Sequence, residues 1–79
     1  MEENTKIIIE RTKRNLERQY SYATKDNPME TPRTYYGQAF AIIEFASDLL
    51  WSMGEYKACQ EVEELWANEW ETKFQELLH

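Results

Sequence analysis

The stretch TYYGQAFAIIEFASDLLWSM, residues 34–53, decides the fold of this 79-residue chain, because it is the most apolar run in the sequence. When its residues are placed at about 100° per residue, as in an α-helix, apolar side chains cover roughly 200° of the circumference. An ordinary surface helix has an apolar stripe of only about 100°. We therefore expect this stretch to form the central helix of a small all-α domain, with a neighbour packed on each side.

One edge of this apolar arc carries Phe40, Ser47 and Trp51, and the outer face of the helix carries Phe45 among polar residues. The sequence leaves open which segment covers that edge. Because aromatic side chains are enriched at binding hot spots, we interpret Phe40, Phe45 and Trp51 as candidate contacts for a protein partner or a second copy of the chain. The alternative is that they belong to the core, since a small domain needs large core side chains.

Two further helices are expected beside the central one, and each boundary has a sequence signal. Pro28 and Pro32 interrupt the helical pattern, and Thr31 is a favourable N-cap before a proline in the first turn. Gly54 can adopt the left-handed conformation that closes a helix. The expected helices cover residues 5–24, 32–53 and 55–78. Together they predict an antiparallel three-helix bundle, built on a hairpin of the second and third helices and forming one domain over residues 1–79.

The composition is acidic, with 15 Asp and Glu against 9 Lys and Arg and a net charge of −6. Such a balance argues against a protein that coats nucleic acid with its whole surface. Several carboxylates fall on the outer faces of the second and third helices. Five of them form a candidate binding surface: Glu44, Asp48, Glu61, Glu64 and Glu71. A basic, nucleic-acid-binding surface of another protein would be attracted to this acidic face.

These features predict a small non-enzymatic interaction module. By analogy of size and charge, we expect an inhibitor or regulator of a basic partner protein, of the kind that phages and mobile elements encode. A protein partner is expected, and a homodimer is a further option. The N-terminal apolar run is too short for a secretion signal, and Glu44 and Asp48 interrupt the longest apolar run, so a cytoplasmic protein without a membrane span is expected.

Two alternatives remain. Arg11, Arg14 and Arg18 recur on one face of the first helix, where their guanidinium groups could bind phosphates of nucleic acid weakly. The other alternative is an all-α nucleotide hydrolase, whose carboxylates would have to converge on Mg²⁺. One cysteine, Cys59, and one histidine, His79, cannot form a zinc quartet, and Cys59 is expected to be a buried apolar residue. No catalytic residue, cofactor or metal ligand is predicted.

Overall fold

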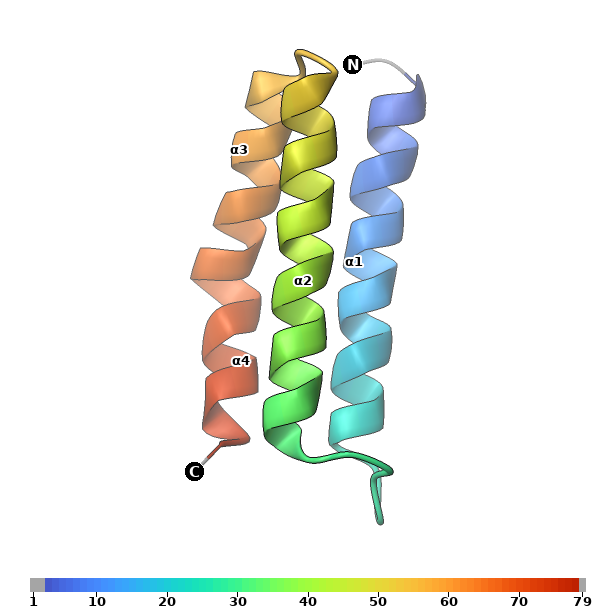
Figure 1. The fold of residues 1–79 in the computed structure, drawn as a ribbon, viewed down its shortest axis with the longest axis vertical. Coiled ribbons are helices and arrows are strands. Elements are labelled where there is room, and N and C mark those ends of the chain that lie inside the picture. The colour runs from blue at the N-terminus through green and yellow to red at the C-terminus, as the bar shows by residue number, and fades with distance from the viewer. Residues whose placement is uncertain (1–2, 79) are drawn as a thin grey trace.

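The computed structural model describes residues 3–78 and confirms an all-α three-helix bundle. Its elements are α1 (Glu3–Ala23), α2 (Pro32–Ser52), α3 (Tyr56–Leu65), the π-helical turn η1 (Trp66–Trp70) and α4 (Glu71–Glu76). In Figure 1 the chain descends through α1, ascends through α2 and descends again through α3 and α4, so successive helices are antiparallel. The bundle measures 40 × 18 × 16 Å.

The ends of α2 form as the sequence predicts. The Thr31 hydroxyl accepts a hydrogen bond from the Thr34 backbone N–H at 3.3 Å, which satisfies one of the free donors in the first turn. At the other end Gly54 has a φ of 78°, in the left-handed region that suits glycine. The Glu55 backbone N–H then donates to the Leu50 carbonyl at 2.9 Å and closes the hairpin between α2 and α3.

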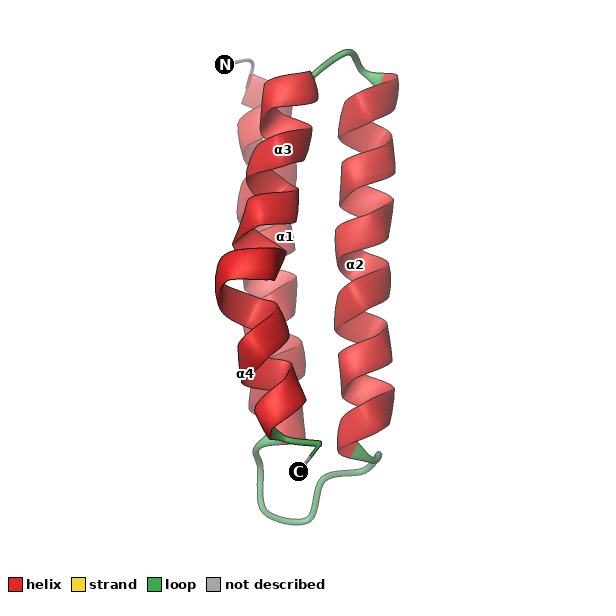
Figure 2. Cartoon of the chain, turned by 90° about the vertical axis from the view of Figure 1, so that its left-hand side faces the viewer, coloured by secondary structure: helices red, strands yellow, loops and turns green. Residues whose placement is uncertain are grey.

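The core lies where the three columns of helix meet. Figure 2 shows α2 on one side, facing α1 and the α3–α4 column together. The buried residues of α2 are Tyr35, Ala39, Ile43, Ala46 and Leu50. Tyr20 of α1 makes edge-to-face contacts with Trp70 and Phe74, at ring-centroid distances of 5.8 and 5.4 Å. These contacts join the first helix to the last and complete the bundle.

The structure differs in one turn from the single helix expected over residues 55–78. The buried residues Val62, Trp66, Trp70 and Phe74 are spaced by four, and each such step overshoots a full α-helical turn by about 40°. In η1 the Glu71 backbone N–H donates to the Trp66 carbonyl five residues earlier. This wider turn rotates less per residue, so Trp70 and Phe74 stay in the core.

Candidate partner-binding site

A groove of about 670 Å³ runs between α2 and α3, on the side of α2 away from α1. We call it the acidic groove. Its residues are Phe40, Ile43, Glu44, Ser47, Asp48, Trp51, Cys59, Glu63, Trp66 and Ala67. The edge of α2 that carries Phe40, Ser47 and Trp51 therefore faces α3 and is covered only in part. Phe40 remains 41% exposed and Trp51 62% exposed.

Aromatic pairs stand at the two ends of the acidic groove. At one end the Phe40 ring lies 6.1 Å from the Trp66 ring, and at the other Trp51 lies 4.4 Å from Tyr56, both measured between ring centroids. Helical spacing produces this arrangement, because positions 40, 44, 47, 48 and 51 share one side of α2. The exposed rings offer apolar surface that the fold itself does not bury.

Three carboxylates lie between the aromatic ends, namely Glu44 and Asp48 from α2 and Glu63 from α3. No lysine or arginine of the described chain lines this groove. Within residues 3–78 the one salt bridge joins Lys73 to Glu69, with 3.6 Å between Nζ and Oε1, so the groove carboxylates have no ion-pair partner there. The acidic groove therefore concentrates negative charge between the aromatic rings at its two ends.

Cys59 and Ser47 form the polar floor of the acidic groove. The Cys59 thiol donates to Oε1 of Glu63 at 3.3 Å and lies 3.7 Å from the Ser47 hydroxyl oxygen. Burial is the main cause that raises the pKa of the Cys59 thiol; the hydrogen bond with Ser47 lowers it, and Glu63 raises it further. The thiol therefore stays protonated at neutral pH and acts as a hydrogen-bond donor, not as a nucleophile.

Trp66 lines the acidic groove at the end where Phe40 lies. Its indole nitrogen is buried and makes no hydrogen bond to any side chain or backbone group of residues 3–78. Such an unsatisfied donor costs about 1–3 kcal/mol. Trp66 is also the first residue of the π-helical turn, so this irregular turn of the helix lies beside the acidic groove.

The five carboxylates predicted as one acidic surface fall into separate places. Glu44 and Asp48 line the acidic groove, whereas Glu61 and Glu64 line one hollow on α3 and another that α3 shares with Ile9 and Lys13 of α1. Glu71 begins α4 and is half-buried. Sequence reasoning did not include Glu63, although its position four residues after Cys59 places it on the same side of α3.

The three aromatic candidates also separate. Phe40 and Trp51 belong to the acidic groove, but Phe45 lines a second groove, of about 400 Å³, between α1 and α2. We call this the apolar groove, because its exposed surface is mainly apolar and its lining includes Ile7, Ile8, Ile42, Phe45 and Leu49. Phe45 is 72% exposed and is not a core residue.

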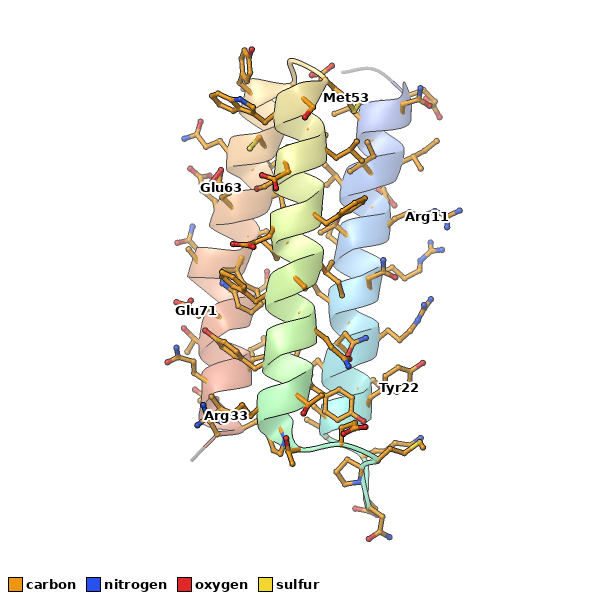
Figure 3. The ribbon with its side chains drawn as sticks, viewed as in Figure 1. Arg11, Tyr22, Arg33, Met53, Glu63 and Glu71 are labelled. Carbon is orange, nitrogen blue, oxygen red and sulfur yellow. The ribbon has the colours of Figure 1, made fainter. Side chains whose placement is uncertain are left out.

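The arginines predicted as a phosphate site lie along the outer side of α1, and Arg11, Arg14 and Arg18 are all exposed. Figure 3 shows Arg11 on the opposite side of the bundle from Glu63. Arg11 and Arg14 share a shallow hollow with Lys6, Glu3 and Glu10, so the two carboxylates offset part of the local positive charge.

Within residues 3–78 no group of three or more His, Cys, Asp or Glu side chains is placed to hold a metal ion. No helix in that range is long and apolar enough to cross a membrane. His79 lies outside the described residues. Comparison of the chain with models of protein families, with curated proteins and with solved structures gave no match.

Proposed function

We propose that this chain is a protein-interaction module that binds a basic segment of a partner protein in the acidic groove. The observation that carries the proposal is the combination of exposed aromatic rings at both ends with three carboxylates between them that form no salt bridge within residues 3–78. Aromatic side chains that the fold leaves exposed are typical anchors of protein interfaces. A negative field with no basic side chain in it selects for a positive partner.

The dimensions of the acidic groove suggest what would fill it. Phe40 and Trp51 are eleven residues apart on α2, which corresponds to roughly 17 Å along the helix axis. This length suits about three turns of a partner helix, with an apolar residue between the rings and Lys or Arg beside the carboxylates. Arginine fits best, because its guanidinium can stack on an indole and pair with a carboxylate at once.

The class of partner follows from the same chemistry. Proteins that bind nucleic acid do so through basic surfaces rich in Arg and Lys, and such surfaces complement the acidic groove. A module seated on one would exclude nucleic acid from it. We therefore propose that the chain inhibits or regulates a nucleic-acid-binding protein, and that it does so by occupancy and not by catalysis.

The test uses a fluorescently labelled amphipathic helical peptide of about 14 residues with Arg on one face and Leu on the other, followed by anisotropy. Its counterpart with Glu in place of Arg is the negative probe. The triple variant Glu44→Gln, Asp48→Asn, Glu63→Gln should bind the Arg peptide less tightly. At about 0.2–1 kcal/mol for each exposed charge, the loss should be roughly 3- to 150-fold and should shrink with added salt.

The matched control removes the same charge elsewhere, with Glu61→Gln, Glu64→Gln and Glu71→Gln. It should weaken binding of the Arg peptide less than threefold, through the overall field alone. Equal losses in both triple variants would show that net charge attracts the peptide and that the acidic groove is not a site. Equal binding of the Glu peptide would also contradict the proposal.

A second candidate function is binding of nucleic-acid phosphates by Arg11, Arg14 and Arg18. All three side chains are exposed, and none forms a salt bridge to a carboxylate in the part of the chain that the structure describes. A low-salt gel shift with duplex DNA tests this candidate. Retardation that is lost in an Arg11→Glu, Arg14→Glu variant would support it, and no retardation would remove it.

A further inference from the structure

We propose that two copies of this chain form a dimer through the face made by α1 and α2, around a two-fold axis parallel to the helices. The apolar groove would lie at the centre of this contact. The centre of this contact is a different groove from the one proposed for the peptide, although Glu44 and Asp48 lie at the edge of both.

The apolar groove presents large side chains that the fold leaves accessible. Phe45 is 72% exposed and Ile7 45% exposed, and Leu49 is exposed beside them. Phe45 stands on the outer side of α2, while Ile7 and Ile8 of α1 and Ile42 of α2 line the hollow next to it. A projecting ring beside an apolar hollow allows the ring of each copy to fill the hollow of the other.

The charges on this face favour a second copy as the occupant. Among the described residues, the one charged side chain that lines the apolar groove is Arg11. The lining of this groove contains no carboxylate, so two copies of a chain with a net charge of −6 would repel each other less through it than through the acidic groove. A basic helix of another protein would be repelled by Arg11 and attracted to the acidic groove instead.

The two edges of the face carry opposite charges. Arg11, Arg14 and Arg18 lie along the outer edge of α1. On α2, Glu44 and Asp48 lie roughly 60–100° around the helix from Phe45, at the opposite edge. A two-fold axis parallel to the helices lays α1 of one copy over α2 of the other. The arginine edge then meets Glu44 and Asp48 of the partner subunit, twice.

The alternative two-fold axis lies across the helices and pairs α1 with α1. It would set the arginine edges against each other, so like charges disfavour it. The full side of the bundle sets the largest area that this contact could cover. A side of 40 × 18 Å offers on the order of 700 Å² per copy, close to the roughly 800 Å² that stable interfaces bury on each partner.

Glu44 and Asp48 belong to both proposed contacts. If a basic segment neutralises them in the acidic groove, the dimer loses its charge pairs, so the two contacts should oppose each other. This coupling arises only if both proposals hold, and the dimer is therefore tested without any peptide.

The experiment is sedimentation velocity over a concentration series, with circular dichroism to check folding. The wild type should show a reversible dimer, and Phe45→Glu should weaken its association at least tenfold. Tyr56→Glu is the matched control, because it makes the same change at an exposed ring on α3, outside this face, and it should leave association unchanged. A wild type that is monomeric at every concentration, or equal weakening by both variants, would overturn the proposal.

Charge exchange gives a second test that does not alter the apolar groove. The variant Arg11→Glu, Arg14→Glu should weaken the dimer, and adding Glu44→Arg and Asp48→Arg should restore it. Adding Glu61→Arg and Glu64→Arg instead restores the same net charge on α3, outside the α1–α2 face, and should not restore the dimer. Equal rescue by both additions would assign the effect to net charge and refute this two-fold arrangement.

Discussion

Replacing two phenylalanines by alanine, one at a time, should show which ring stabilises the folded core and which does not. Phe74 is fully buried and touches the rings of Tyr20, Trp66 and Trp70, so Phe74→Ala should cost about 3–5 kcal/mol. Phe45 keeps 72% of its surface exposed. It therefore buries roughly 55 Å² of the ~200 Å² that a phenylalanine offers, and at about 25 cal/mol per Å² this is worth no more than ~1.5 kcal/mol.

Alanine is also the better helix former, which should reduce the cost of Phe45→Ala to about 1 kcal/mol or less. Urea unfolding followed by tryptophan fluorescence measures both variants. It should be run at low protein concentration, so that self-association contributes nothing. A 79-residue chain has about 4–12 kcal/mol of stability in total, so Phe74→Ala should remove at least about a quarter of it. If Phe45→Ala lowered the free energy of unfolding by more than about 2 kcal/mol, the claim that this ring contributes little to the fold would be refuted.

Three further predictions concern the backbone and the buried thiol. In thermal unfolding, Gly37→Ala should stabilise the protein by about 0.5–1 kcal/mol, because a Cβ at Gly37 meets no atom within 4 Å. Gly54→Ala should destabilise it by about 1 kcal/mol, because Gly54 has a φ of 78°. The opposite order of stabilities would show that the hairpin turn is not formed as described. Because burial raises the pKa of Cys59 above its ordinary value of 9.0, the folded state keeps a proton that the unfolded chain releases, so stability should fall as pH rises above about 9.0. Urea unfolding at pH 8 and pH 10 should show a smaller fall for Cys59→Ala than for the wild type, and equal falls would contradict the burial of the thiol. Deletion of the exposed Asn68 should convert the π-helical turn into α-helix and change stability by less than about 2 kcal/mol. Deletion of the exposed Ala41 should instead rotate half of α2 out of register by ~100° and unfold the protein. Equal losses of helical circular dichroism signal in the two deletion variants would contradict the proposed reason for the π-helical turn.

The boundaries of the helices were predictable because their signals are local. Thr31 before Pro32 and the single glycine after Met53 act on the backbone within one turn, and each lies where the structure begins or ends α2. The apolar positions of α2 were predictable for a similar reason, since helical periodicity alone selects its buried face.

The remaining features depend on how the helices pack. Periodicity shows that the edge with Phe40 and Trp51 is apolar, but only the arrangement of the helices decides that α3 lies beside it. The π-helical turn arises because three successive steps of four residues end at Phe74, a conflict between α-helical pitch and core position. Because this spacing is visible in the sequence, the π-helical turn could have been predicted. The separation of Glu44 from Glu61 and Glu64 could not, because it depends on how α2 and α3 pack together.

The measurement that tests the proposed function most directly is a nitrogen-15 NMR titration of the protein with the Arg/Leu helical peptide. The three tryptophan indole N–H groups report separately, because Trp51 and Trp66 line the acidic groove while Trp70 lies in the core beside Tyr20. We expect the indole signals of Trp51 and Trp66 to shift, together with the backbone amides around Glu44, while Trp70 stays in place. Shifts centred on the arginine edge of α1, or no shifts at millimolar peptide, would contradict the assignment of the acidic groove as the binding site.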